Sequence, residues 1–219
     1  LCSEEKISNG SYGTEVSEKE YYNEKIIRDT VKTAFALASK RRKILNYLDK
    51  SNVLGTSLLW KKIVYEISRG YPEVEVRHYY IDNAAMRLLE NPSEFDVIVT
   101  SNMFGDIISD EGTALTGTAA LYPSAELSLE GNIIYTPNQL HYNDETLTGQ
   151  NRINPIGSIA CIALMLRHSF GLEKEALAVT EAINKPIMEG YATEDIYHSP
   201  FQKLLGTDEI GDKVADFIK

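Results

Sequence analysis

The chain has 219 residues, of which 43% are hydrophobic and 25% charged, a composition typical of a globular protein and not of a disordered one. Its formal net charge of −10 argues against binding to nucleic acid, and its apolar runs are too short or too interrupted to span a bilayer. Cys2 and Cys161 form neither a Cys-x-x-Cys site nor a disulfide framework, so we expect a reducing compartment and a cytoplasmic protein.

The first half of the sequence predicts an arm followed by alternating helices and strands. Residues 1–15 are polar and contain glycine, which indicates an irregular arm or hairpin that needs a partner surface. Residues 17–43 carry a helical apolar stripe, with Ser17 and Glu20 as a capping box and a basic run at 40–43 that we interpret as a solvated helix end. Strands are then expected at 44–48, 74–81 and 95–100, and helices at 57–68, 84–91 and 103–116. This alternation predicts an α/β architecture in which helices cover a sheet.

The second half predicts fewer strands and longer helices. A short strand at 132–135 precedes a polar loop at 136–152. Residues 153–166 read as a buried helix that contains Cys161 as a small core residue, and residues 173–188 as an amphipathic helix. The final helix, at 207–219, has Thr207 or Asp208 as its expected cap.

The strongest local signal for chemistry is the segment NMFGDIISDE at residues 102–111, directly after a buried run. Asp106 and Asp110 stand four residues apart, so on a helix both carboxylates project from one face and could share a hard divalent cation. In α/β proteins ligands gather at the carboxyl ends of strands, where this junction lies. The alternative is that both are solvated acids in a first helical turn, favoured by the helix dipole.

Polar residues follow two other predicted strands. Asp82 could supply a third carboxylate, which would complete an oxygen-rich site suited to Mg²⁺ or Mn²⁺. Lys50 beside such a site could transfer protons, because a neighbouring dication lowers the pKa of an amine. The alternative for Lys50 is an ordinary surface lysine after a strand.

Three motifs in order carry a resemblance to a known family. The segments LDKSNVLGTSLLW at 48–60, YIDNAAM at 80–86 and DVIVTSNMFGDIISDE at 96–111 resemble the lysine, aspartate and metal-binding motifs of the isocitrate and isopropylmalate dehydrogenase family. The Leu59-Trp60 ending is similar to the isopropylmalate branch. The resemblance runs from about residue 17 to the end of the chain.

The resemblance implies a two-domain fold that differs from the usual Rossmann fold and that is incomplete here at its N-terminus. Residues 1–116 would form part of the dimerisation and metal or substrate domain, with an N-terminal arm, and residues 117–219 the C-terminal half of the cofactor-binding domain. It also implies a homodimer with shared active sites. Asp106 and Asp110 of one subunit would then hold the metal, while Lys50 and Asp82 reach in from the other.

The implied activity is metal-dependent oxidative decarboxylation of a hydroxy-dicarboxylic acid with NAD as hydride acceptor, the substrate being 3-isopropylmalate in leucine biosynthesis. Mg²⁺ or Mn²⁺ would stabilise the negative charge that develops on the substrate oxygens. Lys50 and Asp82 would be the catalytic pair. The resemblance assigns NAD contacts to Asn52, His141, Asn154 and Asp195.

The cofactor loop departs from the family pattern between residues 136 and 155. Thr146 stands where the family has its ribose-binding acid, and Tyr142 replaces a glycine; Gly55, outside this loop, also replaces a family acid. Asp144 could substitute for the lost acid, so the choice between NAD and NADP stays open. His141 could equally be a plain loop histidine.

Other parts of the family pattern lie upstream of Leu1, among them the first strands, the arginines that grip the substrate and the catalytic tyrosine. We therefore expect preceding residues, a companion chain or a cleaved partner to supply them, and we expect the fragment alone to be inactive. One alternative is a catalytically weak or inactive homologue with a regulatory or structural role. Another is a metal-binding protein without redox function.

Overall fold

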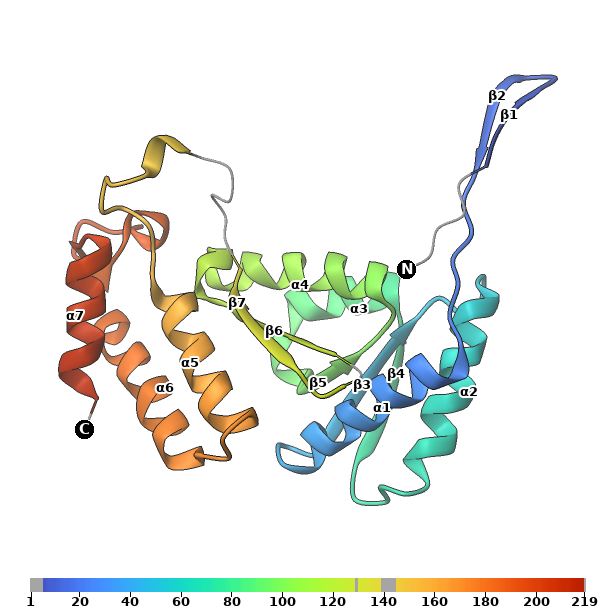
Figure 1. The fold of residues 1–219 in the computed structure, drawn as a ribbon, viewed down its shortest axis with the longest axis horizontal. Coiled ribbons are helices and arrows are strands. Elements are labelled where there is room, and N and C mark those ends of the chain that lie inside the picture. The colour runs from blue at the N-terminus through green and yellow to red at the C-terminus, as the bar shows by residue number, and fades with distance from the viewer. Residues whose placement is uncertain (1–5, 129, 139–144, 219) are drawn as a thin grey trace. The chain divides into compact units, whose positions relative to one another are not determined.

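The computed structural model describes residues 6–128, 130–138 and 145–218. The chain divides into two compact units, Leu1–Gly112 and Thr113–Lys219. Both units combine helices with strands (Figure 1), so the predicted α/β class is confirmed.

The first unit is built around a three-stranded parallel sheet with the strand order β4-β3-β5. Its elements in chain order are β1 (Lys6–Gly10), β2 (Gly13–Ser17), α1 (Glu24–Ser39), β3 (Ile44–Asp49), α2 (Gly55–Ser68), β4 (Glu75–Tyr80), α3 (Ile81–Glu90), β5 (Val97–Val99) and α4 (Asn102–Thr116). β1 and β2 pair antiparallel, which confirms the predicted hairpin. In the central strand β3, Leu45 lies opposite Val76 of β4 and Val97 of β5.

The first helix begins later than the sequence predicted. Its cap is Asn23, whose side chain accepts a hydrogen bond from the backbone N–H of Ile26 at 3.0 Å. The capping box expected at Ser17 and Glu20 is wrong, because Ser17 is the last residue of β2. Asn and Ser cap helices about equally well, and Asn23 is the cap because Ser17 is paired in the hairpin.

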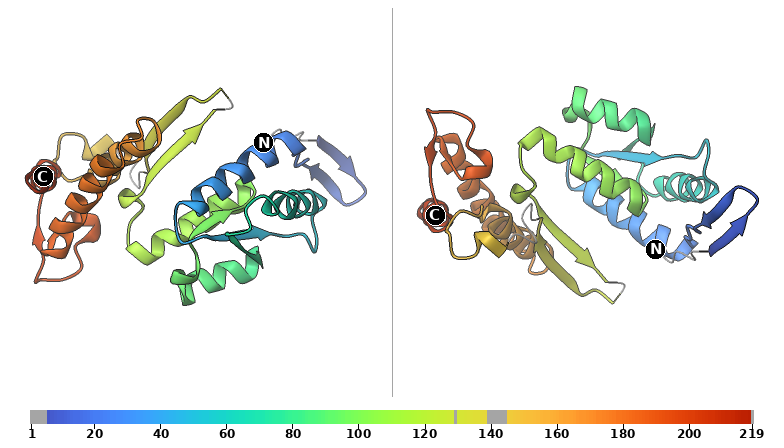
Figure 2. Two further views of the ribbon diagram at one scale, coloured as in Figure 1. Left: turned by 90° about the horizontal axis from the view of Figure 1, so that it is seen from below. Right: turned by 90° about the horizontal axis from the view of Figure 1, so that it is seen from above.

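Helices cover the sheet on both faces, and Figure 2 shows α1 and α3 on opposite sides of it. Leu45 and Tyr47 of β3 face α1 and α2, where Phe35 is fully buried beside them. Leu48, on the other face, packs against Ala84 and Leu88 of α3, and against Phe95. Burial of one such large apolar side chain contributes about 1.5–3 kcal/mol, so the alternation along β3 fixes which face each helix covers.

The basic run at residues 40–43 is exposed and follows the end of α1, as predicted, and two of its residues also bind Asp96. α1 stops at Ser39, and the guanidinium of Arg41 donates to Oδ1 of Asp96 at 2.8 Å. The backbone N–H of Arg42 donates to Oδ2 of the same carboxylate at 2.9 Å, and the side chain of Asp96 is fully buried. The run therefore fixes the amino end of β5 against the turn before β3.

The second unit contains β6 (Pro123–Leu127), β7 (Ile133–Pro137), α5 (Ile156–His168), α6 (Glu173–Met188), β8 (Tyr191–Ala192), β9 (Lys203–Leu204) and α7 (Thr207–Phe217). β6 and β7 form an antiparallel ribbon, of which the sequence predicted only β7. The core lies between α5, α6 and α7, where Ile156, Ala182 and Ile210 are almost completely buried. Cys161 is buried as predicted.

The last helix begins with a cap that the sequence did not indicate. Gly206 is its N-cap, and the backbone N–H of Gly206 donates to Oε2 of Glu209 at 2.8 Å. The backbone N–H of Asp208 donates to Oδ1 of Asn151 at 3.0 Å. The caps expected at Thr207 or Asp208 are wrong, because a side chain from a distant loop satisfies the first turn.

Among the residues that the structure describes, every helix is too short or too polar to cross a membrane.

Candidate active site

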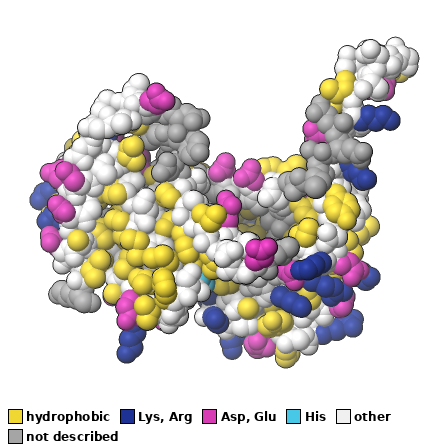
Figure 3. All heavy atoms as spheres, viewed as in Figure 1, with side chains coloured by type: hydrophobic (Ala, Val, Ile, Leu, Met, Phe, Trp, Pro, Cys, Tyr) yellow, Lys and Arg dark blue, Asp and Glu magenta, His cyan; other side chains and the backbone are white. Residues whose placement is uncertain are grey.

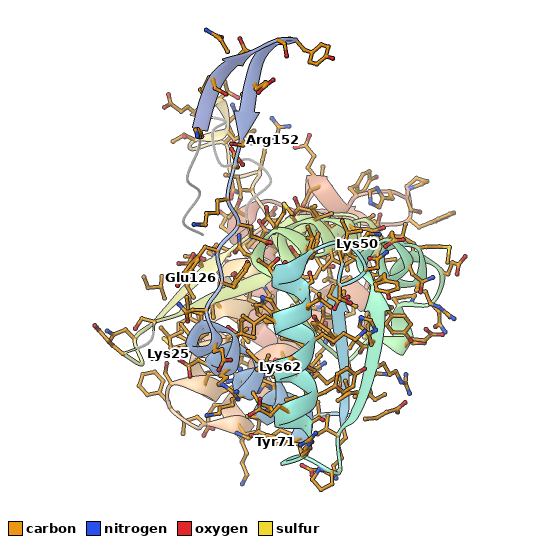
Figure 4. The ribbon with its side chains drawn as sticks, turned by 90° about the vertical axis from the view of Figure 1, so that its right-hand side faces the viewer. Lys25, Lys50, Lys62, Tyr71, Glu126 and Arg152 are labelled. Carbon is orange, nitrogen blue, oxygen red and sulfur yellow. The ribbon has the colours of Figure 1, made fainter. Side chains whose placement is uncertain are left out.

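Polar residues follow all three strands of the parallel sheet at its carboxyl end. Lys50 comes directly after β3, Asp82 lies in the first turn of α3 after β4, and Asn102 begins α4 after β5. Because the strands are parallel, these three positions share one edge of the sheet. Figure 4 shows Lys50 at this edge, with Tyr71 at the opposite end of the same unit.

Lys50 and Asp82 are in direct contact. The Lys50 Nζ atom lies 2.5 Å from Oδ1 of Asp82, and the two side chains are 27% and 66% exposed. The hydrogen bond from Lys50 lowers the pKa of Asp82 below its usual value. The structure therefore brings together the proposed proton-transfer group and an ionised carboxylate that remains accessible.

Asp106 and Asp110 lie on α4, where both are exposed. Four residues of helix separate them by little more than one turn, so they occupy one face as the sequence indicated. Phe104 and Ile108, on the other side of the helix, are buried. Packing of these apolar residues therefore turns the two acids outward.

Within the described parts of the chain, no group of three His, Cys, Asp or Glu side chains is placed to hold a metal ion. Asp106 and Asp110 could supply two oxygen ligands of the kind that Mg²⁺ and Mn²⁺ prefer. Asp82 is paired with Lys50 and does not complete this set in the single chain. The donor chemistry of Asp106 and Asp110 fits a hard divalent cation.

Asn52 lies in the turn between β3 and α2, where it is exposed. The turn is closed by backbone hydrogen bonds from Val53 and Leu54 to the carbonyl of Lys50, both at 2.9 Å. Asn52 is thus held on the same edge of the sheet as Lys50.

In the second unit, two predicted cofactor residues that are far apart in sequence form a hydrogen bond. The Asn154 side-chain amide donates to Oδ2 of Asp195 at 3.2 Å, and the buried Thr193 hydroxyl donates to Oδ1 at 2.6 Å. Asn154 also accepts from the backbone N–H of Ile156, the first residue of α5, at 2.9 Å. Asn154 is only 8% exposed, so its surroundings fix its orientation.

An ion pair beside these residues was not predicted. Arg152 binds Glu194 through two hydrogen bonds, from Nε at 2.6 Å and from Nη2 at 2.5 Å. Arg152 and Glu194 flank Asn154 and Asp195 in the sequence, so two parallel contacts join the same pair of loops. Nothing in the local sequence pattern relates residues that lie 42 positions apart.

Three residues of the altered cofactor loop, Tyr142, Asp144 and the predicted NAD contact His141, lie outside the described residues. Thr146, which stands where the resemblance places the ribose-binding acid, lies exposed in the short 3₁₀ helix Glu145–Leu147. Gly55 opens α2, and a Cβ atom there would meet no atom within 4 Å among those described.

The sequence reading also passed over a buried pair behind Lys50. Asp49 is the last residue of β3 and only 2% exposed, and its Oδ1 atom lies 2.8 Å from Nε2 of His78 on β4. The signal in the sequence was an acid at the end of one predicted strand and a histidine on the next.

The chain is similar to known proteins over most of its length. A family model described as isocitrate/isopropylmalate dehydrogenase matches residues 2–214. The chain is 46% identical to the 3-isopropylmalate dehydrogenase of Thermotoga maritima over 194 residues, which cover 89% of this chain and 53% of the relative. It is 43% identical to that of Chromobacterium violaceum over 206 residues, which cover 92% of this chain and 57% of the relative. The chain thus spans about half the length of the curated relatives it matches.

Solved structures give the same picture. A β-decarboxylating dehydrogenase from Thermococcus kodakarensis matches 99% of this chain with a TM-score of 0.85 at 25% identity, over 60% of its own length. The isocitrate dehydrogenase from Methylococcus capsulatus matches 98% of this chain with a TM-score of 0.84, also at 25% identity and over 62% of its own length.

Proposed function

Because the chain belongs to the isocitrate/isopropylmalate dehydrogenase family and has its fold, we propose that it is part of a 3-isopropylmalate dehydrogenase that acts in leucine biosynthesis. The reaction would oxidise the hydroxyl-bearing carbon of the substrate, with NAD⁺ as hydride acceptor, and release the neighbouring carboxylate as CO₂. The observation that carries this proposal is the contact between Lys50 and Asp82 at the carboxyl edge of the sheet. The relatives that bear this name support the choice of substrate.

Asp106 and Asp110 would hold the divalent cation, with Asp82 as the third carboxylate. When bound, the cation would supply positive charge that stabilises the alkoxide and the enolate, and NAD⁺ would supply the hydride acceptor. The two acids of α4 are exposed and four residues apart on one face of the helix, a spacing that suits binding of an ion at the surface of α4.

Lys50 would transfer protons at the substrate hydroxyl and later at the enolate carbon. Its Nζ atom lies 2.5 Å from Oδ1 of Asp82, so this contact holds it in one position. A positioned acid or base of this kind contributes about 10²–10⁴-fold to a rate.

Asn154 and Asp195 would contact NAD from the second unit, and Asn52 and His141 would be further contacts. The support is the hydrogen bond between Asn154 and Asp195, which places an amide and a carboxylate at one position in the second unit. An ordered carboxylate and amide can recognise donors and acceptors on an adenine or a ribose.

Partner chains would complete the molecule. The hairpin β1–β2 lies away from the sheet of its unit (Figure 1) and pairs with no third strand among the described residues, which suits contact with a second subunit in a homodimer with shared active sites. Hydrophobic side chains gather over α5 and α6 at the lower left of Figure 3. Ile162 of α5, Leu177 of α6 and Phe170 between the two helices are 46%, 47% and 62% exposed. Such a surface would be covered by the other half of the relatives' length, as preceding residues or as a companion chain.

The test is a turnover assay on the complete protein with 3-isopropylmalate, isocitrate, homoisocitrate, tartrate and malate, each with Mn²⁺ and with a chelator. We expect NAD⁺ reduction only with Mn²⁺, and fastest with 3-isopropylmalate. Lys50→Met should lose about 10²–10⁴-fold in kcat, while Lys62→Met, an exposed lysine on α2, serves as the control. A faster reaction with another acid would change the assigned substrate, and the absence of NAD⁺ reduction with all five acids would reject the proposal.

A second candidate is a regulatory or structural homologue, which the altered cofactor loop favours. The single hydroxyl of Thr146 cannot accept hydrogen bonds from two ribose hydroxyls in the way that the two oxygens of a carboxylate do. Isothermal titration distinguishes the two. An active dehydrogenase should bind both Mn²⁺ and NAD⁺, whereas binding of Mn²⁺ alone would favour the second candidate. Titration with NADP⁺ alongside would decide the cofactor preference.

A further inference from the structure

Asp49 is a buried carboxylate at a position that needs an explanation. It is the last residue of the central strand, it directly precedes Lys50, and it is 2% exposed. Taking a carboxylate out of water is costly unless partners compensate it. Asp49 therefore needs partners that compensate for its burial.

The partners of Asp49 hold it in its ionised form. Burial, the largest influence on its pKa, opposes ionisation, but the hydrogen bond with His78 and those from Ser51, with the nearby Tyr47 hydroxyl, outweigh it and lower the pKa. The His78 Nε2 atom is 2.8 Å from Oδ1, and the backbone N–H of Ser51 donates to the same atom at 3.1 Å. An ionised carboxylate can only accept, so Nε2 of His78 carries the hydrogen.

His78 is itself held between two aromatic rings. The ring of Tyr47 stacks on it with centroids 5.3 Å apart, and the ring of Tyr80 meets it edge-on at the same distance. In the sheet, Tyr47 is the register partner of His78, and Asp49 is that of Tyr80. The contact between Asp49 and His78 therefore joins the carboxyl end of β3 to that of β4.

These two strands end at the two residues of the candidate site. β3 leads into Lys50, and β4 leads into α3 with Asp82 in its first turn. The backbone N–H of Lys50 is held as well, because it donates to the hydroxyl of the buried Ser57 at 3.3 Å. The contact between Lys50 and Asp82 thus depends on the relative position of two strand ends that Asp49 and His78 join.

We propose that Asp49 and His78 are positioning residues, which hold the ends of β3 and β4 in the register that brings Lys50 onto Asp82. This proposal rests on the proposed function of Lys50 and Asp82. Asp49 and His78 act through Lys50 and do not touch the substrate. Loss of such a supporting contact in other sites costs about 10–100-fold in activity.

The test compares variants of the complete protein. Asp49→Asn and His78→Leu should lower kcat about 10–100-fold with KM for substrate and NAD⁺ unchanged. His78→Gln, which keeps a donor near Nε2, should recover most of the lost kcat. Asp96→Asn is the matched control, because Asp96 is an equally buried carboxylate of the same unit at the amino end of the sheet, bound to Arg41. Its kcat should stay at the parent value.

A second measurement does not depend on activity. Competitive labelling of amines, quantified by mass spectrometry, reports the reactivity of Lys50 relative to that of the exposed Lys62. We expect Lys50 to label several-fold faster in Asp49→Asn than in the parent, because its ammonium no longer rests on Asp82, and to keep the parent rate in Asp96→Asn.

The outcomes separate the proposals. Equal loss of kcat in Asp49→Asn and Asp96→Asn, or unchanged labelling of Lys50 in Asp49→Asn, would overturn the positioning role. If the parent reduces no NAD⁺ while Asp49→Asn still accelerates the labelling of Lys50, the proposed function fails and the positioning role stands.

Discussion

Lys50 and Asp82 are separated by 32 residues of sequence, and their side chains meet at 2.5 Å. Each follows a strand of one parallel pair, in which Asp49 lies opposite Tyr80. The register of that pair therefore places the ammonium beside the carboxylate.

Replacement of Asp106 by Asn should abolish metal-dependent turnover while the fold stays intact. Asp106 is an exposed residue of α4, so the loss of its charge removes an oxygen ligand and no packing. Turnover with increasing Mn²⁺ and the thermal unfolding midpoint would be measured together. Asp216→Asn, an exposed acid of α7, is the control, and undiminished activity of Asp106→Asn would refute the assigned role.

Asp96 should stabilise the protein at neutral pH and less so in acid. Burial, the largest influence on its pKa, favours the neutral form, but Arg41 and Arg42 outweigh it and lower the pKa. A carboxyl whose pKa is lowered in the folded state adds stability above its unfolded pKa of about 3.9, and that stability is lost as pH falls through the folded value. Asp96→Asn should therefore lower the free energy of unfolding by about 1–3 kcal/mol at pH 7.

Urea unfolding at pH 7 and pH 3 checks this dependence. The difference between the parent and Asp96→Asn should shrink at the lower pH, because the parent carboxyl takes up a proton there. Asp212→Asn, an exposed acid on α7, should show little difference at either pH. A difference of the same size at both pH values would contradict the assigned charge of Asp96.

Replacement of Asn154 by Asp should weaken NAD⁺ binding. The new carboxylate could still accept from the backbone N–H of Ile156, but it would face the carboxylate of Asp195 in place of an amide donor. Loss of a hydrogen bond to a charged group costs about 1.5–3 kcal/mol, which corresponds to a rise of roughly 10- to 150-fold in Kd. Isothermal titration measures the Kd for NAD⁺, and Asn184→Asp on the exposed side of α6 is the control.

Gly157 should not tolerate a side chain. A Cβ atom there would lie 2.5 Å from the carbonyl oxygen of Ala120 and 3.2 Å from that of Tyr122, and backbone atoms cannot move aside cheaply. Gly157→Ala should therefore destabilise the protein by about 1–3 kcal/mol. Gly211→Ala on α7 meets no atom within 4 Å among those described and should stabilise it by up to about 1 kcal/mol. Thermal unfolding midpoints of both variants check this, and a midpoint of Gly157→Ala equal to that of the parent would contradict the prediction.

The sequence alone determined the family and the class of fold. Alternating apolar runs predicted most helices and strands of the first unit, because periodicity is a local property that burial imposes on each element. The acids at Asp106 and Asp110 were found in the same way, since a spacing of four on a helix places two side chains on one face. The strands β8 and β9 were missed because segments of two residues carry no periodicity, and β6 was missed as well.

Only the tertiary structure decided which residues meet. The contacts of Lys50 with Asp82, Asp49 with His78 and Asn154 with Asp195 join residues 29 to 41 positions apart. The caps at Asn23 and Gly206 likewise depend on where a hairpin ends and on where Asn151 reaches. Such contacts are set by strand register and by the packing of helices on a sheet, and those are properties of the folded chain and not of any segment.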